Sequence, residues 1–125
     1  MGADKKRIII IDDDPNNIRE IKDMLEPKGY SVFFASDGPS GIEKIKNLKP
    51  DLLLLDLVLP GQSGFKIAQE IRALPEAKYI PIIAISLKRE DIDKHIAAHS
   101  GIADYVEKPI DYQRLFYIIK DIIGE

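Results

Sequence analysis

The chain alternates short, fully apolar runs with segments in which apolar residues recur every three or four positions. The two longest runs, Ile8–Ile11 and Leu52–Leu55, are bounded by charged residues. Runs of this length without polar alternation are typical of strands buried on both faces, as in parallel sheets. Segments of this kind predict strands over Arg7–Ile11, Ser31–Ala35, Asp51–Asp56, Ile80–Ser86 and Ala103–Val106.

Helix signals occupy the intervals between the predicted strands. Asp14 is suited to cap a helix, because aspartate is a preferred residue at that position. Pro15 suits the first position of the helix, where no amide donor is needed. Gly29 is suited to close that helix. The apolar spacing predicts further helices over Pro39–Leu48, Gly64–Leu74, about Glu90–His99, and Asp111–Ile123, with Leu57–Ser63 as a loop.

The alternation of strands and helices predicts one α/β domain of the (βα)₅ type. Strands that are joined through helices run parallel with right-handed crossovers, so that helices cover both faces of the sheet. The chain has 125 residues, which is the usual size of one domain. We therefore expect a single domain over 1–125, with its core over about 6–124 and no effector domain.

Composition narrows the class of protein. The sequence contains no cysteine, which excludes disulfides, thiol nucleophiles and cysteine-bound metals. Its net charge is −3, so the chain lacks the excess of basic residues that nucleic-acid binding needs. No apolar stretch approaches the roughly 18 residues of a membrane span, and the first residues lack a signal-peptide core. We expect a cytoplasmic protein with neither nucleic acid nor a membrane as a direct partner.

Polar side chains follow the predicted strands where each strand ends. Asp12 and Asp13 follow the first strand, Asp56 ends the third, Ser86 ends the fourth, and Lys108 follows the fifth. The carboxyl ends of parallel strands meet at one edge of a sheet, where ligands bind. Converging carboxylates repel unless a divalent cation such as Mg²⁺ neutralises them. A carboxylate nucleophile beside a metal site, a lysine and a hydroxyl suits phosphoryl transfer.

These residues lie in four segments that resemble the signature blocks of the response-regulator receiver domain of two-component signalling. The segments read IIIIDDDPNNIRE, PDLLLLDLVLPGQSG, PIIAIS and GIADYVEKP, in the order and spacing of that family and over nearly the whole chain. The resemblance implies a flavodoxin-like, doubly wound parallel sheet of five strands in the order 2-1-3-4-5, counted along the chain.

The resemblance also implies roles for the acidic residues. Asp56 resembles the phosphoacceptor. Asp12 and Asp13 resemble the acidic pair that holds Mg²⁺ or Mn²⁺, with Asp13 a direct ligand and Asp12 acting largely through water. The metal would also take the Asp56 carboxylate and the backbone carbonyl of Val58.

The remaining matches resemble the switch residues of the family. Ser86 resembles the hydroxyl that moves to the phosphoryl group, Lys108 the cation that pairs with that group, and Tyr105 the aromatic switch. The bond before Pro109 matches a peptide that is usually cis in the family. Leu87 departs from the pattern, because a small residue commonly follows the switch hydroxyl.

The function implied is that of a phosphoacceptor switch, a signalling protein rather than a turnover enzyme. A histidine kinase or a histidine phosphotransfer protein would supply the phosphoryl group. An unidentified downstream protein would bind the face formed by Glu90–His99, Ala103–Val106 and Asp111–Ile123. The alternative is a degenerate receiver that acts as a phosphorylation-independent interaction module, and Leu87 is the feature that favours it.

Two further patterns are open to more than one interpretation. His95 and His99 are spaced for a helical metal site, but without a third ligand they are better explained as exposed helix polarity. Tyr112, Phe116 and Ile123 widen the apolar arc of the last helix beyond the core stripe of that helix. Core packing would explain this excess, and the alternative is a partner or homodimer surface.

Overall fold

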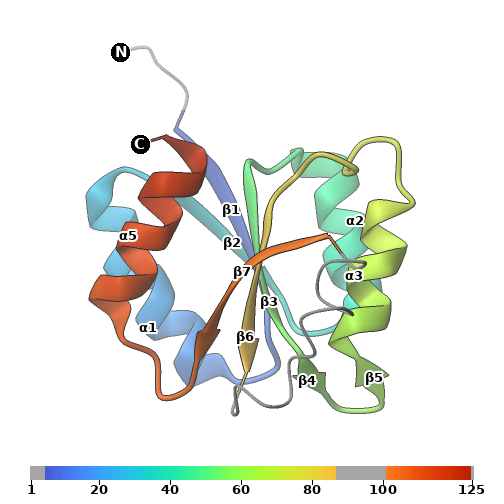
Figure 1. Ribbon diagram of the computed structural model, residues 1–125, viewed down its shortest axis with the longest axis horizontal. Coiled ribbons are helices and arrows are strands. Elements are labelled where there is room, and N and C mark those ends of the chain that lie inside the picture. The colour runs from blue at the N-terminus through green and yellow to red at the C-terminus, as the bar shows by residue number, and fades with distance from the viewer. Residues whose placement is uncertain (1–4, 87–100, 125) are drawn as a thin grey trace.

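The structure is a computed structural model that describes residues 5–86 and 101–124. Figure 1 shows a central sheet with helices on both sides. The strands of this sheet are β1 (Arg7–Ile11), β2 (Ser31–Ala35), β3 (Leu52–Asp56), β6 (Ile82–Ser86) and β7 (Ile102–Glu107). The helices are α1 (Pro15–Leu25), α2 (Gly38–Leu48), α3 (Gly64–Arg72) and α5 (Tyr112–Ile123), and a short hairpin is formed by β4 (Val58–Leu59) and β5 (Gln62–Ser63).

The five strands lie in the order β2-β1-β3-β6-β7, and every neighbouring pair is parallel. Counted along the chain, this is the predicted flavodoxin-like order 2-1-3-4-5, and the prediction is confirmed. Strand order reverses at β1, because β2 lies on one side of it and β3 on the other. The carboxyl ends of β1 and β3 are therefore neighbours at the point where ligands bind in sheets of this kind.

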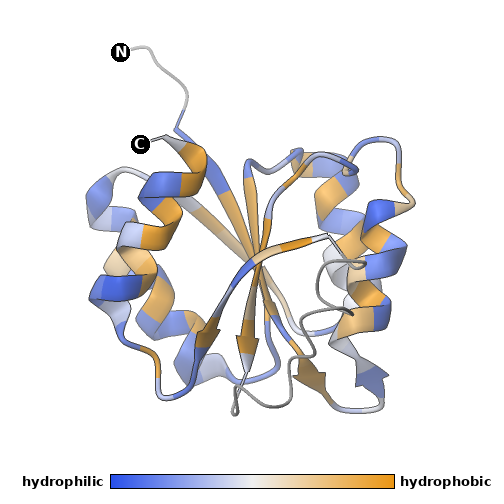
Figure 2. Cartoon of the chain, viewed as in Figure 1, coloured by the Kyte–Doolittle hydropathy of each residue, from blue (hydrophilic) through white to orange (hydrophobic). Residues whose placement is uncertain are grey.

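The apolar runs are buried on both faces of the sheet, as predicted. Ile8–Ile11 and Leu52–Leu55 have no exposed surface. Alternate residues of β1 face opposite sides, because side chains along a strand alternate in direction. Ile8 and Ile10 belong to a core with α1 and α5, whereas Ile9 and Ile11 belong to a second core with α2 and α3. In Figure 2 the strands form an apolar layer between helices whose outer faces are polar.

Helix boundaries follow local capping chemistry. The Asp14 side chain accepts a hydrogen bond from the Asn16 N–H at 2.9 Å, which confirms the predicted cap of α1. Gly29 is in the left-handed conformation and closes the 3₁₀ turn Glu26–Lys28 that follows α1. The helix α3 ends at Arg72 rather than at the predicted Leu74, because a residue that precedes a proline, here Pro75, is disfavoured in a helix.

The segment predicted as a loop after β3 contains the β4–β5 hairpin. Val58 pairs with Ser63 and Leu59 with Gln62, and Pro60 and Gly61 form the turn between them. Strands of two residues are too short to show an alternating pattern, so no periodic signal predicts them. Gly64 lets the backbone after the hairpin approach Leu57 closely, because a Cβ atom there would collide with the Cα atom of Leu57.

Part of the apolar excess on α5 packs against the core and α1. Tyr112, Phe116 and Ile123 all contact the core cluster that α1 and α5 share. The Tyr112 hydroxyl donates to the Glu20 carboxylate at 2.7 Å, and the Lys28 ammonium lies 4.5 Å from the centre of the Phe116 ring. These contacts support the core interpretation for the three side chains.

Some predictions fall on residues outside the described ranges. They concern the helix Glu90–His99, the pair His95 and His99, and the departure at Leu87. Among the helices of 5–86 and 101–124, none has both the length and the apolar character that a membrane crossing requires.

Candidate functional site

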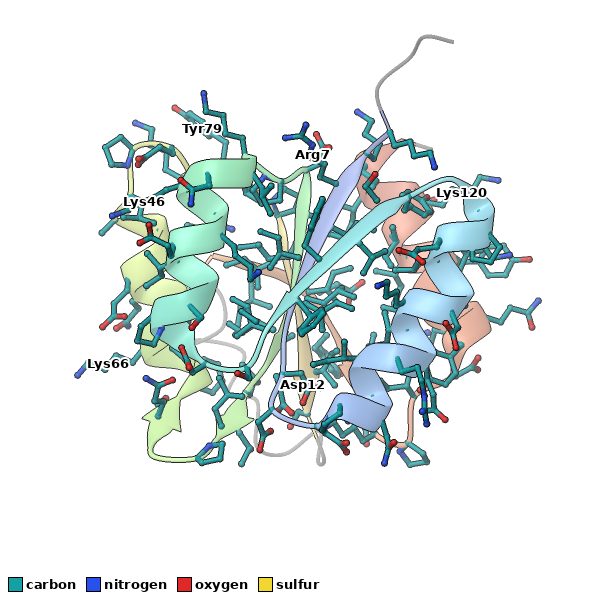
Figure 3. All side chains as sticks on the ribbon, turned by 180° about the vertical axis from the view of Figure 1, so that it is seen from behind. Arg7, Asp12, Lys46, Lys66, Tyr79 and Lys120 are labelled. Carbon is teal, nitrogen blue, oxygen red and sulfur yellow. The ribbon has the colours of Figure 1, made fainter. Side chains whose placement is uncertain are left out.

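Asp12, Asp56 and Ser86 are buried at the carboxyl ends of three adjacent strands. In the described part of the chain they are the only buried carboxylates and the only buried serine. Asp12 follows β1, Asp56 ends β3 and Ser86 ends β6. Figure 3 shows Asp12 at one edge of the sheet and Arg7, at the start of β1, at the opposite edge. A buried polar group is costly unless it is paired, so a concentration of three such groups makes this end of the sheet the candidate site.

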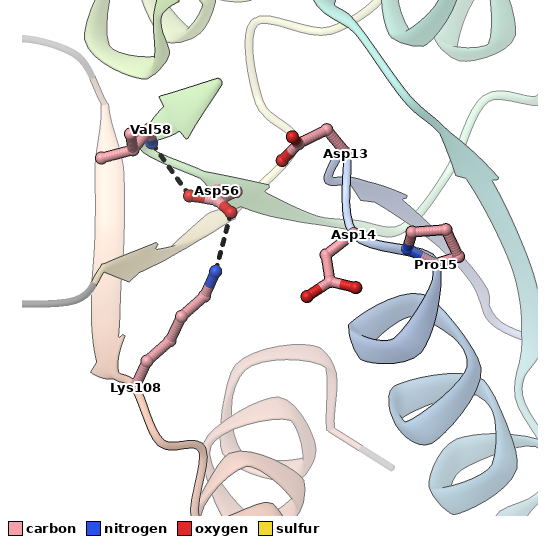
Figure 4. Close-up of a pocket in the computed structure, with 6 residues that line it drawn as sticks. All are labelled: Asp13, Asp14, Pro15, Asp56, Val58 and Lys108. Atoms are coloured by element: carbon pink, nitrogen blue, oxygen red, sulfur yellow. Dashed lines mark hydrogen bonds and ion pairs between the residues drawn. The ribbon is translucent and has the colours of Figure 1, made fainter. Parts of the chain in front are cut away.

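Asp56 is held through both of its carboxylate oxygens (Figure 4). The Val58 N–H donates to Oδ1 at 2.9 Å, and the Lys108 ammonium lies 2.9 Å from Oδ2. The Asp56 side chain is 4% exposed and that of Lys108 is 19% exposed. A charge-assisted bond in so dry a setting fixes the carboxylate firmly. Asp56 therefore presents a positioned, charged oxygen to the pocket.

Asp12 and Asp13 complete a cluster of three carboxylates with Asp56. One oxygen from each lies within 4.8 Å of the others. Asp12 is fully buried and accepts from the Asp14 N–H at 2.9 Å, whereas Asp13 is exposed. In Figure 4, Asp13 lies on the segment after β1, across the pocket from Asp56. All the donor atoms are hard oxygens, which suits Mg²⁺ or Mn²⁺.

The electrostatics of the cluster shift two pKa values. Burial raises the pKa of Asp12 from 3.8 to about 6, against the opposing effect of the Asp14 N–H and with further support from the charge of Asp56. Burial alone would lower the pKa of Lys108, but the hydrogen bond and negative charge of Asp56 outweigh it, and the pKa is raised. Lys108 is therefore a permanent cation in this site.

The raised pKa of Asp12 predicts a pH-dependent stability of the metal-free protein. The folded chain keeps the Asp12 proton up to about pH 6, whereas the unfolded chain loses it near 3.8. Ionisation of Asp12 therefore lowers the free energy of unfolding above about pH 6. This loss disappears below about pH 4, where Asp12 is protonated in both states. We expect metal-free Asp12→Asn to be more stable than wild type by on the order of 1–3 kcal/mol near neutral pH.

Urea unfolding in the presence of a chelator measures this difference. The advantage of Asp12→Asn should shrink as the pH falls through 6 and vanish below about 4. The Asn side chain can still accept a hydrogen bond from the Asp14 N–H, so this contact is preserved in the variant. A variant that is less stable than wild type at every pH would contradict the prediction.

The strand β7 carries Tyr105 and ends at Glu107, directly before Lys108. Glu107 pairs with Ser86, and the Lys108 N–H donates to the Ser86 carbonyl at 2.7 Å. The peptide bond between Lys108 and Pro109 is cis. Tyr105 pairs with Ala84 and packs with it in a small apolar cluster. Ser86 therefore ends β6 and Lys108 directly follows the neighbouring β7, as the strand-end pattern predicts.

The site also contains contacts that sequence reasoning missed. The Asn17 side chain lies 3.5 Å from the second oxygen of Asp12. A signal for it exists in retrospect, since Asn17 stands four residues before the buried Ile21 and thus on the inner face of α1. No sequence pattern predicts the hydrogen bond from the Val58 N–H to Asp56, because this bond depends on how the chain turns after β3.

A pocket of about 390 Å³ opens above these groups. Its lining residues are Asp13, Asp14, Pro15, Asp56, Val58 and Lys108. One wall is acidic and one is cationic, with the held carboxylate of Asp56 between them (Figure 4). The arrangement can bind a divalent cation on the acidic side and an anionic group beside Lys108, with Asp56 within reach of both.

Comparisons with known proteins agree with this geometry. A family model described as the response regulator receiver domain matches residues 8–120. Protein PilH of Pseudomonas aeruginosa is 33% identical over 118 residues, which cover 94% of this chain and 98% of PilH. The DNA-binding response regulator MtrA of Mycolicibacterium smegmatis is 32% identical over 115 residues, which cover 92% of this chain and 49% of MtrA.

A solved structure resembles the chain closely. It is the receiver domain of sensor histidine kinase PA1611 from Pseudomonas aeruginosa PAO1, with a magnesium ion coordinated in the active site cleft. The two chains superpose with a TM-score of 0.86 at 30% identity, over 98% of this chain and 100% of the other.

Proposed function

Because the chain belongs to the response regulator receiver domain family, we propose that it is a phosphoacceptor switch of a two-component system or phosphorelay. One observation carries the proposal: Asp56 is a buried carboxylate whose oxygens are bound by Val58 and Lys108, beside two further carboxylates. A structural aspartate needs no such arrangement. A nucleophile does, because its orientation and charge decide its reactivity.

In the proposed reaction an Asp56 oxygen attacks the phosphorus atom of a phosphohistidine. A new P–O bond forms while the P–N bond breaks, and the imidazole leaves with the bonding electron pair and takes up a proton. The product is an aspartyl phosphate, and its hydrolysis by water restores the carboxylate. Such a transfer requires little covalent chemistry from the protein beyond the nucleophile, and depends on positioning and charge stabilisation.

Each remaining residue has a role in this proposal. Lys108, 2.9 Å from Asp56, is placed to balance the negative charge of the incoming phosphoryl oxygens. Ser86 supplies a hydroxyl at the end of β6, the strand beside β3 and β7. Tyr105 lies on β7 opposite Ala84 and packs against it. Movement of Ser86 and Tyr105 toward the phosphorylated site would change the surface formed by β7 and α5, which a downstream protein would bind.

The acidic residues fit a divalent cation. Asp12, Asp13 and Asp56 would hold Mg²⁺ or Mn²⁺, together with the backbone carbonyl of Val58. When bound, the cation neutralises the carboxylates and the phosphoryl oxygens. A histidine kinase or a histidine phosphotransfer protein would be the physiological donor, since these proteins carry the phosphohistidine.

Labelling with acetyl phosphate tests the proposed function. Mass spectrometry should detect one added phosphoryl group when Mg²⁺ is present and none when a chelator is present. Hydroxylamine should remove the group, because it cleaves acyl phosphates and leaves phosphoserine intact. A folded protein that stays unlabelled with Mg²⁺ would instead indicate a phosphorylation-independent interaction module.

A further inference from the structure

The edge strand β7 is paired to the sheet in an irregular register. It has a single neighbour in the sheet, β6. Ile82 pairs with Ile102 but Ile83 pairs with Asp104, so that Ala103 is an extra residue in β7. Side chains on a strand alternate between faces, so a shift of one residue moves each of them to the opposite face. The bulge at Ala103 therefore determines which residue of β7 reaches the site.

The observed register brings Lys108 to Asp56. With the bulge, Ser86 pairs with Glu107, and Lys108 follows directly beside the site. Without the bulge, Ser86 would pair with Val106, and Lys108 would lie one residue farther beyond the end of β6 than it does in the structure. The buried Val106 would also turn away from the core. The contact between Lys108 and Asp56 thus requires that the start of β7 be held in place.

Arg72, at the end of α3, holds that start. Its guanidinium donates to the carbonyl oxygens of Ala77 at 2.8 Å and of Gly101 at 2.9 Å, and also to that of Ile80. Gly101 immediately precedes β7, and Ile80 lies just before β6. Arg72 is partly buried, and its planar fork of donors binds all three carbonyls at once. One side chain therefore fastens the entries of two neighbouring strands together.

The backbone at Gly101 is shaped for this contact. Its φ angle is +75°, a conformation that side-chain-bearing residues rarely adopt. A Cβ atom there would also collide with the Nε atom of Arg72. The absent side chain lets the guanidinium pack directly on the chain one residue before β7 begins.

We propose that Arg72 is a positioning residue for Lys108: by fastening Gly101 to Ile80, it keeps β7 in the bulged register in which Lys108 contacts Asp56. The catalytic consequence rests on the proposed function, whereas the register itself does not. Arg72 binds carbonyls at the opposite end of the strands from Asp56, so any effect on the reaction passes through β6 and β7. Asp12 and Asp13 follow β1 and Asp56 ends β3, and Arg72 makes no hydrogen bond to any of the three.

The test compares Arg72→Met with wild type in acetyl phosphate labelling and in calorimetric Mg²⁺ titration. Arg72→Met keeps the aliphatic stem and removes every donor. We expect the labelling rate to fall about 10- to 100-fold, as a misplaced catalytic group produces. Mg²⁺ affinity should stay the same or rise, because Arg72 touches no metal-site residue and a displaced Lys108 no longer opposes the cation. Arg19 is an exposed arginine on α1. The variant Arg19→Met is the matched control and should leave both quantities unchanged.

A double-variant cycle separates positioning from general loosening. In a Lys108→Ala background, Arg72→Met should cause no further loss of labelling, because its effect passes through Lys108. An equal loss in both backgrounds, or a parallel loss of Mg²⁺ affinity, would overturn the proposal. So would an unchanged labelling rate. If Arg72→Met does not fold, Arg72→Lys takes its place in the same cycle.

Nuclear magnetic resonance of the unphosphorylated protein tests the register without the reaction. In wild type, cross-strand contacts should join Ile83 to Asp104 and the Lys108 ammonium signal should respond to Asp56→Asn. In Arg72→Met both features should weaken. If wild type is never labelled but these changes occur, the proposed function fails while the positioning role stands. If the contacts are unchanged in a labelled protein, the positioning role fails alone.

Discussion

Replacing Asp56 by asparagine should abolish covalent phosphorylation by acetyl phosphate in the presence of Mg²⁺. The amide oxygen is uncharged and a poor nucleophile, so the acyl phosphate has no group on which to form. The Asn side chain could still accept the Val58 N–H, which lies 2.9 Å from Oδ1. Its NH₂ group would face the Lys108 ammonium, and the ion pair would be lost. Intact-protein mass spectrometry measures the added group directly.

A matched control is available on α1. Asp23 is an exposed aspartate that does not line the pocket, so Asp23→Asn removes the same charge and should be labelled like wild type. Detection of a phosphoryl group on Asp56→Asn at the wild-type rate would refute the assignment of Asp56 as acceptor. Peptide mapping of labelled wild type should place the group on the segment that contains Asp56.

Lys108→Ala should slow labelling strongly while leaving the metal site able to bind. The ammonium of Lys108 lies 2.9 Å from Asp56 and is mostly shielded from water. Removing one such stabilising group from a dry site costs about 10²–10³-fold in rate. Mg²⁺ affinity should rise, because a positive charge is removed from beside three carboxylates. This divergence between rate and affinity distinguishes a charge-stabilising role from a structural one.

The two quantities are measured by labelling at saturating Mg²⁺ and by calorimetric titration. Lys66→Met, which removes an exposed lysine on α3, should change neither of them. If Lys108→Ala is labelled at the wild-type rate, Lys108 has no role in the transfer. If its Mg²⁺ affinity falls together with the rate, the effect is on the integrity of the cluster.

Much of the fold could be predicted because local patterns carry it. The unbroken runs Ile8–Ile11 and Leu52–Leu55 indicate strands buried on both faces, and both are fully buried. The capping role of Asp14 depends only on its neighbours, and it was predicted correctly. Strand order came from the family resemblance, since alternation alone permits several parallel orders. The β4–β5 hairpin escaped prediction because it is too short for any periodic signal.

The sequence by itself determined that Asp12, Asp13, Asp56, Ser86 and Lys108 stand at strand ends, because the strands are local features and parallel strands share one carboxyl edge. Only the tertiary structure decided which of these groups touch. The bond between Lys108 and Asp56 joins residues 52 positions apart. It depends on the bulge at Ala103 and on the packing of β7 beside β6. The bond from Arg72 to Gly101 joins residues 29 positions apart and arises in the same way, because side-chain contacts between distant segments are set by register and packing, which no local pattern encodes.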